Sequence, residues 1–201
     1  MCGRYYLDSN VLNKVEKLIW KINKGTGSNA PTPLTLQTGD ICPTQLAPVL
    51  LASKEGNNLC CHMQHWGFVT QQGKIIFNAR SETAAKKPMF SESLACKRVV
   101  IPAVWFYEWN QNKEKNIFYQ KGKSLLFMAG LYYCAPDGER FVILTTQANE
   151  SMSPVHDRMP LLLEENEVFS WILKSEQTQT FLNKRPCLLE RHSEYEQLSL
   201  F

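Results

Sequence analysis

The middle of the chain is a succession of short segments rich in β-branched and aromatic residues, each bounded by turn-forming residues. The segments are Pro48 to Ala52, Leu59 to Phe68, Lys74 to Asn78, Arg98 to Trp109, Ile117 to Gln120, Leu125 to Tyr133 and Arg140 to Thr146. Such composition between Gly- and Asp-containing turns is typical of β-strands. Strands this short and closely spaced predict an antiparallel sheet that is bent or closed into a barrel.

Helical patterns lie on either side of this region. The clearest runs from Asn10 to Ile22, where apolar residues recur on one face after three possible N-cap residues. Further helical signals occur at Ser81 to Lys86, near Asn149 to Ser151, at Asn166 to Leu173 and at Ser175 to Leu182. The Gly- and Pro-rich stretch from Gly25 to Pro33 is expected to be a surface loop. The chain is therefore predicted to be one α+β domain over residues 1–201, β-rich at its centre with peripheral helices.

Composition excludes several classes of protein. No apolar run reaches the roughly 20 residues of a membrane helix, and no apolar stretch follows Arg4 as in a secretory signal. The seven cysteines are odd in number and scattered, so a reducing, cytoplasmic location is expected rather than a disulfide framework. A net charge of +3 is too small to indicate nucleic-acid binding by itself.

Glu108 lies within VVIPAVWFYEW, an otherwise apolar run. An ionised carboxylate is costly to bury unless it is paired or protonated, and such surroundings suit a general acid or base. The alternative is that Glu108 faces solvent at the end of a strand or pairs with a lysine.

An arginine stands two residues after each of three polar candidates. Arg4 follows Cys2, Arg80 follows Asn78 and Arg158 follows His156. In an extended backbone, residues i and i+2 point to the same face, and a guanidinium donates paired hydrogen bonds to phosphate. The pattern fits a substrate with several phosphates around a reactive atom, although three surface arginines paired with acids would look the same.

His156 follows Pro154 and precedes an Asp-Arg pair, which places it on a loop, where functional residues concentrate. Its unperturbed pKa range suits proton transfer at neutral pH, although a lone histidine is often structural.

The CCHMQH stretch at Cys60 to His65 lacks the second Cys-x-x-Cys pair of a zinc site. Neither a metal nor another cofactor is expected.

Several short motifs in order along nearly the whole chain resemble the SRAP family, the SOS response-associated peptidase-like proteins. They are MCGR at Met1 to Arg4, CPTQ at Cys42 to Gln45, WG at Trp66 to Gly67, NARSET at Asn78 to Thr83, IPA and FYEW within Ile101 to Trp109, AGLY at Ala129 to Tyr132, LTTQAN at Leu144 to Asn149 and VHDRMP at Val155 to Pro160.

The resemblance implies covalent capture of abasic sites in single-stranded DNA through Cys2, after removal of Met1. It places Asn78, Glu108 and His156 around that cysteine as catalytic residues. It also implies that arginines hold the phosphates beside the lesion and that an aromatic side chain lies against the DNA; these residues are Arg4, Arg80, Arg158 and Trp109. The peptidase name would refer to the loss of Met1, by self-cleavage or by an aminopeptidase. The expected partner is abasic single-stranded DNA, and the protein is expected to be a monomer.

The sequence departs from the family pattern in three places. WGFVTQQGK lacks the Pro and second Trp that follow WG in many relatives, which removes an aromatic that could stack on a base. Cys42 stands where Ala is usual. Trp105 stands where Gly is usual, and its side chain would either narrow the pocket for the abasic site or pack in the core. Two other functions stay open: a general thiol peptidase with Cys2 as nucleophile and His156 as base, and a DNA-binding module without chemistry.

Overall fold

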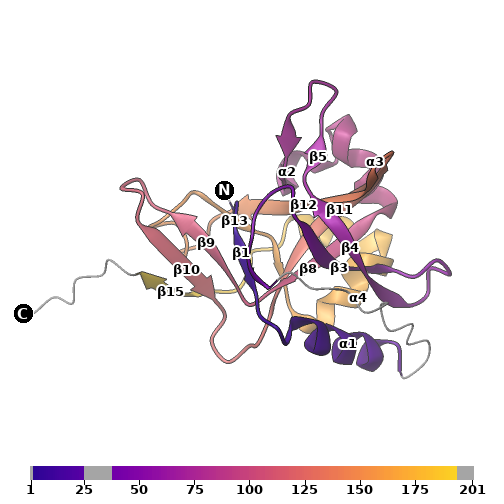
Figure 1. Cartoon of the computed structure of the whole chain (residues 1–201), viewed down its shortest axis with the longest axis horizontal. Helices are drawn as coiled ribbons and strands as arrows, with labels where there is room; N and C mark the ends of the chain where they lie inside the picture. Colours follow the sequence, from indigo (N-terminus) through magenta and orange to yellow (C-terminus); the bar gives the residue numbers. More distant parts are fainter. Residues whose placement is uncertain (1, 25–37, 194–201) are drawn as a thin grey trace, which may run out of the picture.

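The computed structural model describes residues 2–24 and 38–193, and its centre is a closed barrel of strands (Figure 1). The barrel strands are β3 (Leu46–Ala52), β4 (Leu59–Trp66), β8 (Arg98–Ala103), β11 (Leu126–Ala135) and β12 (Gly138–Gln147). Hydrogen bonding runs β12-β4-β3-β8-β11 and returns from β11 to β12, which closes the ring. The β12–β4 pairing is parallel and the other pairings in the ring are antiparallel. The predicted α+β class and barrel are confirmed, with a mixed rather than a purely antiparallel sheet.

Three short strands extend the barrel beside β12 and β11. Strand β7 (Asn78–Arg80) pairs with β12 in parallel, and β13 (Arg158–Pro160) pairs with it in antiparallel orientation. Strand β14 (Leu162–Leu163) pairs with β11. Segments far apart in sequence, one carrying Asn78 and the other leading out of His156, therefore share the neighbour β12.

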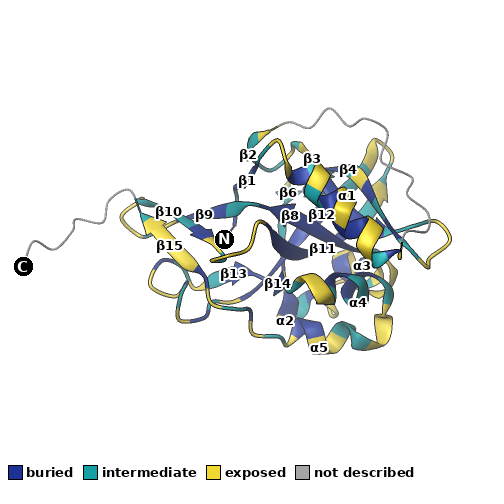
Figure 2. Cartoon of the chain, turned by 90° about the horizontal axis from the view of Figure 1, so that it is seen from below, coloured by how far each residue is buried: buried dark blue, intermediate teal, exposed yellow. Residues whose placement is uncertain are grey.

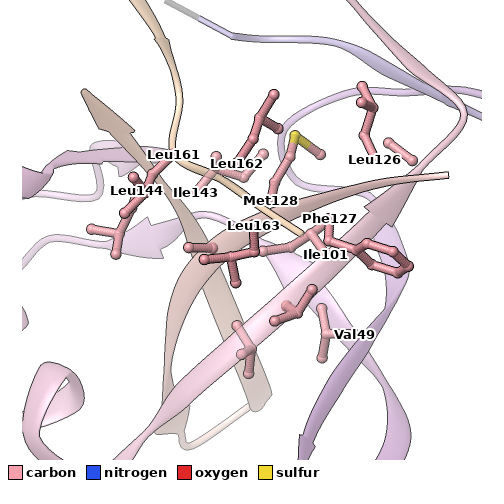
Figure 3. Close-up of a cluster of buried hydrophobic side chains, with 14 of the residues drawn as sticks. Val49, Ile101, Leu126, Phe127, Met128, Ile143, Leu144, Leu161, Leu162 and Leu163 are labelled. Carbon is pink, nitrogen blue, oxygen red and sulfur yellow. The ribbon is translucent and has the colours of Figure 1, made fainter. Parts of the chain in front are cut away.

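Buried hydrophobic side chains of β3, β8, β11 and β12 cluster with those of Leu161 to Leu163 (Figure 3). All six residues of β8 are buried. Gly130 in β11 marks a close approach, because a Cβ there would lie 2.4 Å from Ile101 Cδ1 and 2.6 Å from the Val142 carbonyl oxygen. Only glycine fits between β8 and β12 at that point.

A second, antiparallel sheet projects from the barrel. Its strand order is β15 (Glu190–Ser193), β10 (Lys115–Tyr119), β9 (Trp105–Trp109), β1 (Tyr5–Leu7) and β2 (Gly39–Ile41). The run predicted as one strand from Arg98 to Trp109 is thus two strands, β8 and β9, in different sheets. The chain changes sheets at Val104, whose N–H donates to the Tyr6 carbonyl at 2.9 Å. This change of sheet carries Glu108 out of the barrel and beside the start of the chain. Strands β5 (Phe68–Val69) and β6 (Ile75–Ile76) form a separate hairpin.

Short helices cover the barrel. They are α1 (Val11–Ile22), α2 (Ser81–Ala84), α3 (Pro88–Cys96), η1 (Glu165–Glu167), α4 (Val168–Leu173), η2 (Ser175–Gln177) and α5 (Thr178–Leu182). Figure 2 shows buried residues concentrated in the barrel strands and exposed residues along the helices. The predicted helix near Asn149 to Ser151 is wrong: the segment forms turns, because the Asn149 side chain bonds to the backbone of Ser151 rather than facing solvent. The predicted loop at Gly25 to Pro33 lies outside the described residues.

Arg98, a buried residue of β8, joins two of these helices to the barrel. Its guanidinium is buried and donates to the carbonyls of Leu94 and Ala95 at the end of α3 and of Trp171 and Ile172 in α4, at 2.6–3.1 Å. A positive charge at the carboxyl ends of helices is favourable, because the last carbonyls there lack partners within the helix.

Two features of residues 2–24 and 38–193 bear on function. No helix within them has the length and apolar character that crossing a membrane requires. No group of three His, Cys, Asp or Glu side chains within them could hold a metal ion.

Candidate active site

Cys2 lies at the entry to β1, the strand between β2 and β9. The Tyr107 N–H of β9 donates to the Arg4 carbonyl at 2.9 Å, so the hydrogen bonding between the strands continues into the start of the chain. Cys2 itself is only 1% exposed. Both overall views place this end of the chain close to β13 (Figures 1 and 2).

Asn78 binds the backbone of Cys2. Its Nδ2 donates to the Cys2 carbonyl at 2.8 Å, across a sequence separation of 76 residues. The parallel pairing of β7 with β12 positions it, with Asn78 opposite Ile143. The other end of the amide, Oδ1, is buried and has no hydrogen-bond partner among the described residues. Asn78 therefore fixes Cys2 and retains an acceptor for an N–H group.

Glu108 is buried within β9, with 5% of its surface exposed. Its Oε1 lies 3.5 Å from Nε2 of His156. The alternative that Glu108 faces solvent is therefore wrong. A buried carboxylate beside an imidazole forms a pair that can pass a proton between its members.

The other ring nitrogen of His156 has two neighbours. Nδ1 lies 2.9 Å from the Arg158 N–H and 2.8 Å from Asp157 Oδ1. A neutral ring that accepts from Arg158 carries its proton on Nε2, toward Glu108. A doubly protonated ring would donate to Asp157 instead. His156 thus has a partner for each protonation state.

The Cys2 thiol is held in its protonated form. Burial raises the pKa of this thiol well above its usual range, and the negative charge of Glu108 raises it further. The sulfur lies 3.9 Å from the Arg4 carbonyl oxygen, a weak contact for a thiol donor. A reaction at this sulfur needs a base that removes its proton.

Two of the three arginines are paired with acids. Arg158 donates to both carboxylate oxygens of Glu82, at 2.7 and 2.9 Å, and also to the Thr145 carbonyl at 2.7 Å. Arg4 lies 3.4 Å from Asp40. The alternative that these arginines pair with acids therefore holds for Arg4 and Arg158. Arg80 is exposed.

The i, i+2 argument applies to one of the three pairs. Asn78 and Arg80 lie in the same strand, β7, where alternation puts them on one face. Cys2 precedes β1 and His156 lies between a turn that ends at Val155 and β13, so their arginines are placed by other contacts.

Trp109 is 36% exposed at the end of β9. The Arg4 guanidinium lies 5.3 Å from its ring centroid, within the range of a cation–π contact. Trp105, two residues before Tyr107 in the same strand, stacks on Tyr6 with centroids 4.0 Å apart and ring planes 5° apart. Trp105 and Tyr6 are both half-buried, so the expectation that Trp105 packs in the core is wrong: its ring packs on Tyr6 of the neighbouring strand.

Sequence reasoning missed the acids at this site. Asp40 accepts from the Tyr107 hydroxyl at 2.8 Å as well as contacting Arg4, and Glu82 holds Arg158. Asp157 contacts His156. Glu82 lies in the motif NARSET and Asp157 lies in VHDRMP. The acid beside the basic residues of each motif could have indicated these pairings.

Comparison with protein families matches residues 1–199 to the family described as SOS response associated peptidase (SRAP). The chain belongs to the SRAP family. Among curated SRAP relatives it is similar to abasic site processing protein YoqW of Bacillus subtilis (strain 168), at 30% identity over 187 residues, covering 86% of this chain and 80% of that protein. It is also similar to abasic site processing protein HMCES of Xenopus tropicalis, at 30% identity, covering 75% of this chain and 52% of that one.

Solved structures show the same fold. A protein from Bacteroides thetaiotaomicron superposes with a TM-score of 0.76 at 21% identity, covering 96% of this chain and 91% of that chain. One from Bordetella bronchiseptica gives 0.75 at 20% identity, covering 96% and 99%. The barrel with its projecting sheet is therefore the SRAP fold, and the predicted family is confirmed.

Proposed function

We propose that this SRAP protein captures abasic sites in single-stranded DNA by a covalent bond to Cys2. The observation that carries the proposal is the convergence of four side chains from distant segments. Asn78 holds the backbone of Cys2, and the Glu108–His156 pair stands beside it, close enough for the Glu108 charge to act on the Cys2 thiol.

The chemistry requires both functional groups of an N-terminal cysteine. In the chain as translated, the Cys2 nitrogen is in a peptide bond with Met1, so Met1 must be removed. An unperturbed α-amine has a pKa of about 7.7–8.0, so a useful fraction is neutral at pH 7, unlike an unperturbed lysine amine near 10.4.

The reaction balances without an oxidant, a reductant or a metal. The neutral amine attacks the aldehyde of the opened abasic sugar, and the carbinolamine loses water to give an imine. The Cys2 sulfur then bonds to the imine carbon, its proton goes to the nitrogen, and a five-membered thiazolidine ring closes. Amine, thiol and aldehyde together give thiazolidine and one water.

Each neighbour has a role that fits its contacts. Glu108, whose charge acts on the Cys2 thiol, supplies protons to the sugar oxygen and the carbinolamine, and it carries the thiol proton to the nitrogen as the ring closes. His156 promotes opening of the sugar ring and reversal of the crosslink, and its two partners let it gain or lose a proton. The unpaired Asn78 Oδ1 accepts a hydrogen bond from the Cys2 amine.

The arginines hold the phosphates on either side of the lesion. Arg80 is exposed, so a phosphate can reach its guanidinium directly. Arg4 must first release Asp40, and Arg158 must first release Glu82, before either can bind phosphate oxygens. Carboxylate and phosphate offer the same paired acceptors to a guanidinium, so the exchange needs little change in geometry. Trp109 lies against a base. The protein would act on abasic DNA in the cytoplasm as part of the response to DNA damage.

A general thiol peptidase is the weaker alternative. Such enzymes use a thiolate whose pKa is lowered by an adjacent imidazolium. Here the pKa of the Cys2 thiol is raised, and the Nε2 atom of His156 faces Glu108. The peptidase activity we propose is confined to removal of Met1.

The test is a denaturing gel of mature protein, with Met1 removal checked by mass spectrometry, after incubation with a labelled abasic oligonucleotide. Wild-type protein should give a slow-migrating adduct, and Cys2→Ala and Cys2→Ser should give none. Cys96→Ala, which removes an exposed cysteine, is the matched control and should leave the adduct unchanged. Glu108→Gln should slow the reaction by about 100-fold or more.

An adduct formed by Cys2→Ala would refute the thiazolidine. Hydrolysis of unrelated peptides by mature protein would favour the peptidase. Salt-sensitive DNA binding without any adduct would leave a binding module alone.

A further inference from the structure

A cleft of about 590 Å³ adjoins the candidate site on the side of His156. One wall is the turn between β9 and β10, and the other is the segment that leads from the end of β12 to His156. The volume lies within the range of small-molecule sites, about 300–1,000 Å³. Because His156 lines the cleft, a group bound there would be adjacent to the reacting sugar.

Both walls are built before any ligand arrives. In the first, Asn110 Oδ1 accepts from the backbone N–H groups of Asn112 and Glu114, both at 3.0 Å. In the second, buried Asn149 donates to the carbonyls of Pro186 and Cys187, at 3.1 and 2.9 Å. A site whose walls are already ordered loses less conformational entropy on binding.

Other carboxamides in the cleft remain available. The side chains of Gln111, Asn112 and Gln147 line it, all three are exposed, and none makes a side-chain hydrogen bond within the described part of the chain. Each amide offers two donors and an acceptor. The apolar part of the lining is supplied by Ala148, Pro154 and Val155.

The charge of the cleft differs from that of the arginine side of the site. None of the described residues that line it is Lys or Arg, and Asp157 adds a carboxylate. The described lining of the cleft offers a phosphate no lysine or arginine to bind. A neutral, flat group with hydrogen-bonding edges fits, and a carboxamide pairs with the donor–acceptor edge of a nucleobase, adenine above all.

We propose that the cleft binds the nucleobase next to the abasic site, turned out of the stack while the arginines hold the phosphates. This inference rests on the proposed function for the position of the strand. The inference adds that the affinity for abasic DNA depends on which base neighbours the lesion. Gln147 in one wall and Gln111 in the other would form hydrogen bonds to that base.

The test measures equilibrium binding by fluorescence anisotropy, with single strands that carry a tetrahydrofuran abasic analogue, which cannot form the crosslink. The neighbour on each side is adenine, thymine or a spacer without a base. Wild-type protein should bind at least one base-bearing strand about fivefold or more tightly than the matching spacer. Gln147→Ala and Gln111→Ala should reduce that ratio, each by about threefold or more.

Gln71→Ala is the matched control, since Gln71 is an exposed amide in the turn between β5 and β6 and does not line the cleft. It should leave the ratio unchanged. Equal affinity for base and spacer on both sides, or a base preference that survives both cleft substitutions, would overturn the proposal.

The crosslinking gel separates this result from the proposed function. Normal adduct formation without base dependence refutes the cleft alone. Base-dependent binding without any adduct supports the cleft and refutes the chemistry at Cys2.

Discussion

Replacing Glu82 by glutamine tests whether Arg158 serves phosphate. In the free protein the Arg158 guanidinium is neutralised by two hydrogen bonds to the Glu82 carboxylate, at 2.7 and 2.9 Å. A phosphate must displace this carboxylate before it can use the guanidinium. Glu82→Gln removes the competing charge, and the Thr145 carbonyl, 2.7 Å away, still holds Arg158 in place.

The magnitude follows from counterion release. One additional cation available to a single strand steepens the dependence of log affinity on log salt by about 0.7. Between about 50 and about 200 mM salt, that difference amounts to about a threefold change in relative affinity. The variant should therefore bind single-stranded DNA more tightly than wild type, with an advantage about three times larger at the lower salt concentration.

The assay is fluorescence anisotropy over a salt series, with the tetrahydrofuran oligonucleotide as ligand. Glu92→Gln is the matched control, because Glu92 bonds Lys97 at 2.9 Å and its loss changes the net charge equally. Glu82 is about half exposed, so its loss should cost about 1 kcal/mol of stability or less. Binding no tighter than wild type, or an identical gain in Glu92→Gln, would refute the assignment of Arg158 to phosphate.

Three further outcomes are expected. In protein that retains Met1, Cys2 should resist alkylation at pH 8 while Cys96 reacts, because burial raises the pKa of the Cys2 thiol and the reactive thiolate appears only at higher pH. Peptide mass spectrometry measures both rates, and equal rates would contradict the burial of Cys2. Arg98→Met should lower the free energy of unfolding by about 3–5 kcal/mol in urea titrations, because buried carbonyls lose charged donors. Exposed Arg185→Met should cost less than about 1 kcal/mol, and a similar loss in both would argue against the helix-joining role. Gly130→Ala should cost about 2–4 kcal/mol in the same assay, since the Val142 carbonyl cannot move away without breaking the barrel pairing. An unchanged midpoint would show that the strands can separate there.

Local chemistry in the sequence predicted the strands, the first helix and the candidate residues. Glu108 could be singled out because a carboxylate inside an apolar run needs a partner wherever the run folds. The helix near Asn149 failed for a local reason of another kind, since an Asn side chain that bonds its own backbone favours a turn. The single strand from Arg98 to Trp109 failed because periodicity does not reveal where a chain leaves one sheet for another.

The sequence alone thus determined which residue types were available: a cysteine at position two, an amide, an acid within an apolar run, a histidine and three arginines. Only the tertiary structure decided their partners, because the contacts of Arg4 with Asp40, of Asn78 with Cys2 and of Arg158 with Glu82 span 36 to 76 residues. Asn78 meets the Cys2 carbonyl because β7 pairs with β12 in parallel, and Arg158 meets Glu82 because β13 pairs with the same strand. Hydrogen-bond partners between strands are set by register and by the order of strands around the barrel, and neither is written in the local pattern of residues.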